Sequence, residues 1–205
     1  MFLFQRLFVS IAVFFIFSSV FAHASPSSKL GSVDFPTSGS PEAQKFFLRG
    51  VAALHSFWYD EALKAFQEST KVDPNFVMGY WGEAMTHNKP LWEKQDAEAA
   101  KEALTKIKDI SKITVRELSY LEAVMHLYGE GDKKSRDKAY AKAMEKIYWQ
   151  YPKDLEAACF YALSLLGASR HEDNKLRSKV KAGALAMEVF RKNPEHPCSA
   201  HYTIH

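Results

Sequence analysis

Apolar residues recur at intervals of three and four positions along most of the chain, from Glu42 to Arg191. This spacing gives each successive helix one apolar stripe, because an α-helix completes a turn every 3.6 residues. The same region lacks the alternation of apolar and polar residues between turns that is typical of half-buried strands. We therefore predict an all-α fold whose helices are separated by short loops.

A repeated order of residues refines this prediction. Residues 46–74 contain small, aromatic, small and large residues closed by a proline: Gly50, Tyr59, Ala62, Phe66 and Pro74. This order resembles the tetratricopeptide repeat family, whose helix-turn-helix unit uses a small residue in each helix for close approach. The resemblance gives that role to Gly50 and Ala62 and makes Phe66 the side chain that fills the space between the helices. Pro74 ends the second helix, because proline cannot continue the backbone hydrogen-bond ladder.

Further units follow this one. "LHSFWYDEA" (54–62) is answered after 34 residues by "NKPLWEKQDAEA" (88–99), and "GEAMTHN" (82–88) after 39 residues by "LEAVMHL" (121–127). Thr114 and Glu117 have the spacing of a capping box, which predicts the start of the third unit. Over residues 42–205 the resemblance implies a right-handed solenoid of stacked antiparallel helix pairs, with about four repeats and the start of a fifth.

The first 24 residues have the pattern of an export signal. Arg6 precedes an unbroken apolar run at 7–22, and Ala22-His23-Ala24 comes before Ser25. The run has 16 residues, whereas a membrane-spanning helix needs about 20, so we favour cleavage after Ala24 over a retained anchor and expect no stable membrane span afterwards. Residues 25–41, rich in Ser, Pro and Gly, are expected to form a flexible leader. The mature protein is then periplasmic or secreted, in an oxidising compartment.

Composition and motifs narrow the functional classes. The net charge of +3 becomes +2 without Arg6, and Lys and Glu are interleaved, so the chain lacks the basic excess expected of a nucleic-acid-binding protein. The sequence contains no H-E-x-x-H, G-x-x-x-x-G-K-[ST] or G-x-S-x-G motif and no glycine-rich dinucleotide turn. We therefore expect a non-catalytic protein without a cofactor.

The family resemblance implies a concave groove, lined by the first helix of each unit, as the usual binding surface. Aligned on Gly50, Ala84, Ala123 and Ala162, the groove positions are mostly apolar: Phe47, Val51, His55, Met78, Trp81, Met85, Asn88, Tyr120, Val124, Cys159 and Leu163. Methionine and aromatic side chains repack around varied partners, which favours a hydrophobic segment of a protein or peptide as the ligand. The alternative, that these side chains pack between helices, remains open.

Polar residues interrupt this apolar pattern. Arg49, Glu83 and Glu122 each precede the small residue of a first helix, at a position that the family usually fills with an apolar side chain. Buried there they would need partners, because an unpaired buried charge costs several kcal/mol. We expect a polar ladder in which Arg49 pairs with Glu83 and Glu122 with His126, with His87 in the position equivalent to His126. Such a ladder would be structural, or would serve as a proton relay or ligand site.

The segment "HPCSAHYTIH" (196–205) suggests an alternative function in handling Zn or Cu. Its candidate ligands are His196, Cys198, His201 and His205. If Pro197 opens a helix, the last three share one face, but Cys198 and His205 are then separated by about 10.5 Å of helix rise. Metal–ligand bonds of 2.0–2.3 Å cannot span that distance, so a site would need further ligands, such as His171. Otherwise these residues line the groove or the core.

The two cysteines either form a disulfide or remain free thiols. Cys159 belongs to the fourth unit and Cys198 opens the fifth, and bridging them requires Cα atoms within about 7 Å, which neighbouring helices reach only at a close crossing. Exported bacterial proteins of this repeat type have similar "HP..AHY.IH" stretches before further repeats. That resemblance implies a gene product that continues beyond His205.

Overall fold

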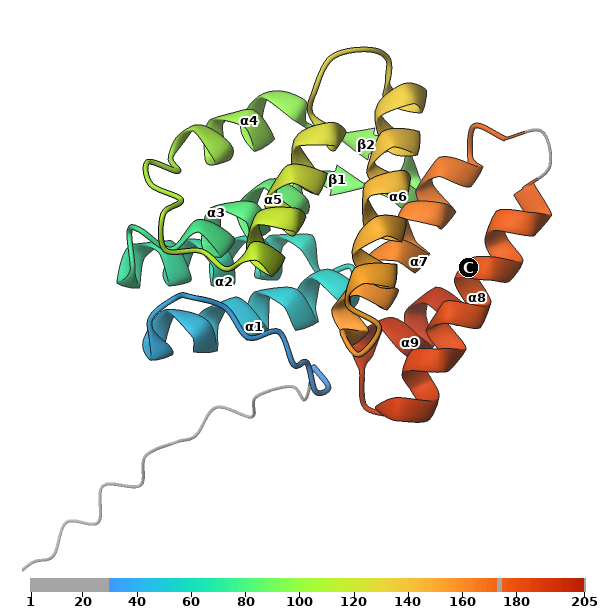
Figure 1. Cartoon of the computed structure of the whole chain (residues 1–205), viewed down its shortest axis with the longest axis horizontal. Helices are drawn as coiled ribbons and strands as arrows, with labels where there is room; N and C mark the ends of the chain where they lie inside the picture. Colours follow the sequence, from blue (N-terminus) through green and yellow to red (C-terminus); the bar gives the residue numbers. More distant parts are fainter. Residues whose placement is uncertain (1–29, 173–174, 205) are drawn as a thin grey trace, which may run out of the picture.

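The computed structural model describes residues 30–172 and 175–204 (Figure 1). Within them the α-helices are α1 (Pro41–His55), α2 (Tyr59–Val72), α3 (Val77–Thr86), α4 (Ala97–Thr105), α5 (Val115–Leu127), α6 (Lys133–Gln150), α7 (Leu155–Ser169), α8 (Lys175–Lys192) and α9 (Pro197–Thr203). The connection from α3 to α4 contains two short antiparallel strands, β1 (Asn88–Lys89) and β2 (Lys94–Gln95), around the 3₁₀ turn η1 (Pro90–Trp92). The all-α prediction is thus confirmed for these residues. The predicted export signal lies outside them.

Helices that are consecutive in the chain pack against each other in pairs. α1 packs on α2, α3 on α4, α5 on α6 and α7 on α8, and α9 then begins against α8 (Figure 1). The second helices α2, α6 and α8 end at Val72, Gln150 and Lys192, each two residues before a proline. For Pro74 this confirms the predicted end of the second helix, and Pro152 and Pro194 have the same position, because proline cannot continue a helix. No helix in the described ranges is both long enough and apolar enough to cross a bilayer.

The close approach predicted within the first unit is present. Gly50 of α1 faces the fully buried ring of Phe66 on α2, and a Cβ atom at position 50 would lie 2.7 Å from that ring. Gly82 of α3 faces the same ring even more closely. Real Cβ atoms do not approach carbon atoms at such distances, so α1, α2 and α3 can pack around Phe66 only because these two positions lack a side chain.

The capping box at the start of α5 is also confirmed, and one of its residues has a second role. Thr114 Oγ1 accepts a hydrogen bond from the Glu117 backbone N–H at 3.2 Å, and Glu117 Oε2 accepts one from the Thr114 N–H at 2.7 Å. The other oxygen, Oε1, accepts hydrogen bonds from the backbone N–H and the hydroxyl of Ser38, at 2.7 and 2.9 Å. One buried carboxylate therefore both caps α5 and holds the segment that precedes α1.

We predict that Thr114→Ala lowers the free energy of unfolding by about 1 kcal/mol, because the first turn of α5 loses the acceptor for one of its N–H groups. Chemical denaturation of the whole chain measures this loss. Lys112→Ala, an exposed change in the preceding loop, is the control and should lie within about 0.5 kcal/mol of the wild type. Equal effects of the two substitutions would contradict a stabilising cap.

Residues 30–40, which we predicted as part of a flexible leader, instead form an extended segment with defined contacts; we call them the N-terminal segment. Its backbone is anchored near the turn between α8 and α9, where Ser32 N–H donates to Glu195 O at 3.0 Å and Asn193 Nδ2 donates to Ser32 O at 2.9 Å. In Figure 1 the segment runs along α1 before that helix begins. Its composition resembles that of a linker, but it carries one large aromatic residue, Phe35, which is fully buried.

Phe35 lies where the first helices of all four pairs converge. Its ring centroid is 5.3 Å from that of Phe47 on α1, 5.8 Å from Trp81 on α3, 4.9 Å from Tyr120 on α5 and 6.5 Å from Phe160 on α7. We call these four aromatic side chains the inner face. The helices bend so far around it that α9 contacts α1, and the inner face is closed by protein rather than open to solvent.

Candidate functional site

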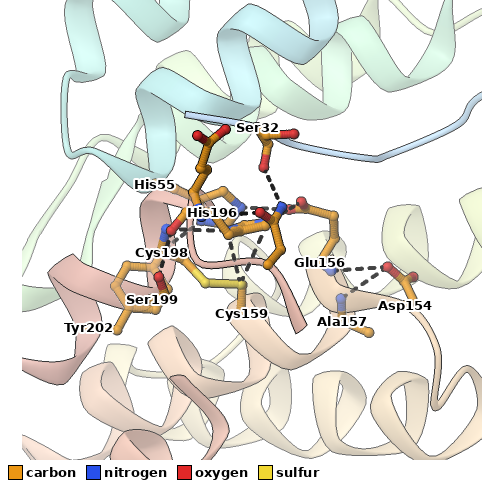
Figure 2. A network of polar contacts seen from close by, with 12 residues as sticks. Ser32, His55, Asp154, Glu156, Ala157, Cys159, His196, Cys198, Ser199 and Tyr202 are labelled. Atoms are coloured by element: carbon orange, nitrogen blue, oxygen red, sulfur yellow. Dashed lines mark hydrogen bonds and ion pairs between the residues drawn. A yellow bond between two sulfur atoms is a disulfide. The ribbon is translucent and has the colours of Figure 1, made fainter. Parts of the chain in front are cut away.

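Four polar side chains from three helices meet in the interior beside the inner face (Figure 2). His55 is the last residue of α1, Glu156 lies in the first turn of α7, and His196 and Tyr202 belong to the start and body of α9. Each is at most 1% exposed. We call them the His–Glu–His cluster; such a concentration of buried polar groups requires that each be hydrogen-bonded.

The hydrogen bonds fix where the protons lie. The backbone N–H of Cys198 donates to His196 Nδ1 at 3.3 Å, so this nitrogen is an acceptor and the proton is on Nε2, which donates to Glu156 Oε1 at 2.7 Å. His55 Nε2 lies 2.6 Å from Glu156 Oε2, and His55 Nδ1 lies 2.7 Å from the Tyr202 hydroxyl. Since an ionised carboxylate only accepts, His55 Nε2 donates to it and Nδ1 accepts from Tyr202. Every polar atom of the three rings and the carboxylate thus has a partner.

The protonation states follow from burial and from these bonds. Burial lowers the pKa of His55, which favours its neutral form. Burial alone would raise the pKa of Glu156, but the adjacent His55 and the hydrogen bonds from His196 and His55 outweigh it and hold the pKa at about 2. Burial also raises the pKa of Tyr202 well above its usual value, so the hydroxyl keeps the proton that it donates. The cluster therefore holds an ionised Glu156 carboxylate beside His55, whose neutral form is favoured by burial.

The start of α7 positions this carboxylate. Asp154 is the N-cap of α7, and its Oδ1 accepts hydrogen bonds from the backbone N–H groups of Glu156 and Ala157. Its Oδ2 accepts from Arg116 Nε at 2.7 Å and from the Tyr120 hydroxyl at 2.9 Å, both on α5. The positive end of the helix dipole also favours a negative charge in the first turn. Helix capping and the contact with α5 therefore fix the start of α7 and with it the position of Glu156.

A disulfide borders the cluster. Cys159 and Cys198 are bridged, with Cα atoms 6.0 Å apart, which answers the question that the sequence left open. Cys159 follows Glu156 by three residues and so lies on the same face of α7. Its Sγ is 3.6 Å from His196 Nδ1, and ligand atoms of His55, Cys159 and His196 lie within 4.8 Å of one another. This is the one group of three or more such side chains placed for a common metal ion among the described residues.

The metal ligands predicted within 196–205 do not come together. His196 and Cys198 are buried in the cluster and the disulfide, but the His201 ring donates from Nδ1 to Pro197 O at 2.8 Å and packs against the Phe57 ring. His205 is outside the described residues. His171 contacts Asp137 at 3.0 Å instead. The short helix α9 therefore supplies one histidine to a common site, and the second comes from α1, far away in the sequence.

The predicted groove residues also require correction. Each is buried in the described structure, so none is exposed on an open groove: Phe47, Val51, His55, Met78, Trp81, Met85, Asn88, Tyr120, Val124, Cys159 and Leu163. Three of them form the inner face around Phe35, and two belong to the His–Glu–His cluster and its disulfide. The alignment placed them on the correct side of their helices, but the curvature of the array and the N-terminal segment cover that side.

The predicted polar ladder does not form. Arg49 is exposed and lies 3.4 Å from Glu61, while the buried Glu83 accepts a hydrogen bond from Thr70 at 2.9 Å and lies 3.6 Å from the Lys106 ammonium. Glu122 and His126 are both exposed, where a charge needs no partner. His87 is half-buried at the end of α3, and burial lowers its pKa. Of the predicted residues, only Glu83 is a buried charge.

Sequence reasoning did not single out Glu156, Tyr202 or Phe35. For Glu156 a signal was available, because its spacing of three from Cys159 puts both on one helix face.

No family model matches the chain, and neither the search of curated proteins nor that of solved structures found a match.

Proposed function

We propose that the chain is an exported, non-catalytic scaffold of the tetratricopeptide type, whose inner face binds an extended protein or peptide segment that carries an aromatic residue. The succession of four helix pairs followed by α9 supports the solenoid assignment. The Cys159–Cys198 disulfide supports export, because disulfides persist mainly in oxidising compartments.

The observation that carries the proposal is the position of Phe35. This residue precedes the first repeat and is not part of the repeated order of residues. Its ring is nevertheless fully buried against side chains from all four first helices. The inner face thus accepts an aromatic ring presented by an extended chain. In the free protein its own segment occupies the place that a partner segment would take.

The polar contacts around Phe35 define the ligand further. The Arg116 guanidinium lies 4.3 Å above the Phe35 ring, within range of a cation–π interaction, and donates a hydrogen bond to Pro36 O at 3.2 Å. Glu117 accepts two hydrogen bonds from Ser38. Arg116 and Glu117 would bind the same groups of an incoming segment, namely an aromatic ring followed by a backbone carbonyl and a donor three residues later.

Displacement by a peptide tests this function. In a full-length Phe35→Ala chain the aromatic position is vacant, and a synthetic peptide of residues 30–40 should bind saturably and raise the thermal midpoint. Binding to the native state stabilises it by mass action, so the rise is measurable even if the variant is partly unfolded. Calorimetry and thermal denaturation are the measurements.

A peptide of residues 30–40 with alanine in place of phenylalanine is the matched control and should produce no shift. The wild-type chain should bind the phenylalanine peptide more weakly than the variant, because its own segment competes. Equal effects of the two peptides, or no effect of either, would refute an aromatic-binding inner face.

A further inference from the structure

We propose that the His–Glu–His cluster binds one Zn²⁺ ion when the Cys159–Cys198 disulfide is reduced, with His55, His196 and the Cys159 thiolate as ligands. In the disulfide the Cys159 sulfur carries no charge to offer a metal. Disulfide formation and metal binding therefore exclude each other, because both use the Cys159 sulfur. This zinc site differs from the one predicted within 196–205, because its ligands come from α1, α7 and α9.

The spacing of the ligand atoms suits zinc. Around a tetrahedral Zn²⁺ with bonds of 2.0–2.3 Å, neighbouring ligand atoms lie about 3.3–3.5 Å apart. Cys159 Sγ lies 3.6 Å from His196 Nδ1, and all three ligand atoms lie within 4.8 Å of one another. Binding to one ion requires the more widely spaced of these atoms to approach one another further. Three protein ligands leave the fourth position to a water molecule, as in other zinc sites with three protein ligands.

Charge balance in the interior favours the divalent ion. Glu156 is a fully buried carboxylate that accepts hydrogen bonds from both histidines, and a Cys159 thiolate would add a negative charge. Zn²⁺ neutralises both, whereas the reduced cluster without the metal would have to keep Cys159 protonated. Buried charges are tolerated when they are paired or coordinate a metal, so the cluster has the anionic composition that a dication requires.

His196 has the kind of hydrogen-bond partner that a zinc-bound histidine usually has on its second ring nitrogen. With Nδ1 of His196 on the metal, its Nε2–H continues to donate to Glu156 Oε1 at 2.7 Å. This is the carboxylate–histidine–zinc arrangement, in which the carboxylate orients the ring and increases its basicity. His55 likewise has Glu156 at one ring nitrogen and Tyr202 at the other, so when one nitrogen binds the metal and gives up its partner, the other keeps a hydrogen bond (Figure 2).

The redox step is balanced by a dithiol. A dithiol reductant transfers two electrons and two protons to the Cys159–Cys198 bond, which breaks into two thiols while the reductant closes to its own disulfide. Zn²⁺ then displaces the proton of Cys159, and Cys198 remains a thiol. The oxidised protein is held together by the disulfide, and the reduced protein by the metal at the same junction of α1, α7 and α9.

Cobalt binding by the full chain tests the inference. Co²⁺ replaces spectroscopically silent Zn²⁺, and a thiolate ligand produces a charge-transfer band in the near ultraviolet. After reduction with dithiothreitol and its anaerobic removal, the wild type should bind one Co²⁺ per chain with this band, and excess Zn²⁺ should abolish the band. The oxidised chain should bind none. One equivalent bound by both forms would overturn the redox dependence.

Two cysteine variants provide a matched comparison. Cys198→Ser and Cys159→Ser both remove the disulfide, but only the second removes the ligand. Cys198→Ser should bind one Co²⁺ without reduction and show the thiolate band, and Cys159→Ser should show neither. Absence of the band in Cys198→Ser, or the same band in Cys159→Ser, would overturn the assignment. If a variant does not fold, as judged by circular dichroism, the reduced wild type decides. Peptide binding is assayed on the oxidised chain, so a failure of the metal-binding proposal can be distinguished from a failure of the proposed function.

Discussion

Replacing Glu156 by alanine should lower the free energy of unfolding by about 3 to 5 kcal/mol. The carboxylate accepts hydrogen bonds from His55 at 2.6 Å and from His196 at 2.7 Å in a site that is fully buried. Its removal leaves two imidazole N–H groups without acceptors and a cavity between three helices, and the loss of one partner of a buried charged network typically costs this much. Denaturant unfolding of the whole oxidised chain at neutral pH measures the effect.

Glu156→Gln keeps the side-chain volume and so separates the contribution of the charged hydrogen bonds from that of the cavity. The amide can accept from the fixed Nε2–H of His196 and donate to His55, which can move its proton to Nδ1 and donate to Tyr202. The cost should therefore be lower, about 1 to 2 kcal/mol.

The contribution of Glu156 should also depend on pH. Because the pKa of Glu156 is lowered from 4.5 to about 2 in the folded state, its stabilising contribution is present above pH 4.5 and is lost as the pH falls toward 2. The difference in free energy of unfolding between the wild type and Glu156→Gln should therefore narrow below pH 4.5. A difference that stays constant with pH would contradict an ionised Glu156.

Phe35→Ala should cost about 3 to 5 kcal/mol, a value usual for removing a fully buried phenylalanine ring. The ring touches aromatic side chains from all four first helices, so its removal opens a cavity at their common junction. The measurement is again denaturant unfolding, supported by limited proteolysis, which should cleave residues 30–40 faster in the variant. Asp34→Ala, an exposed neighbouring change, should stay within about 0.5 kcal/mol. A Phe35→Ala chain as stable as Asp34→Ala would mean that the segment does not pack as described.

The sequence predicted those features that depend on local chemistry. The all-α class, the capping box of Thr114 and Glu117, the prolines beyond the helix ends and the contact of Gly50 with Phe66 all follow from residues close together in the chain or from a repeated pattern. The repeat alignment also predicted the inward direction of His55 and Cys159. Their predicted exposure on an open groove was wrong, because both are buried. Local chemistry determines which side of a helix is apolar but not what covers it.

The features that were missed depend on contacts between distant segments. Phe35 is a single aromatic residue in a segment of linker-like composition, and no periodicity marks it as a core residue. The partners of His55 are more than 100 residues away, on α7 and α9, so only the curvature of the array brings them together. The same curvature explains why the polar ladder failed, because Arg49, Glu122 and His126 lie on the outside, where water solvates them.

The contact between α1 and α9 has a consequence for how the molecule unfolds. In an open repeat array each unit touches only its neighbours, so the terminal units can fray while the middle stays folded. Here the first and last described helices share hydrogen bonds through His55, Glu156 and Tyr202, and the N-terminal segment links α5 to the turn before α9. Within the described residues, the first and last helices of the array thus stabilise each other. Amide hydrogen exchange should accordingly reveal one cooperative transition, with α1 and α7 protected to the same degree.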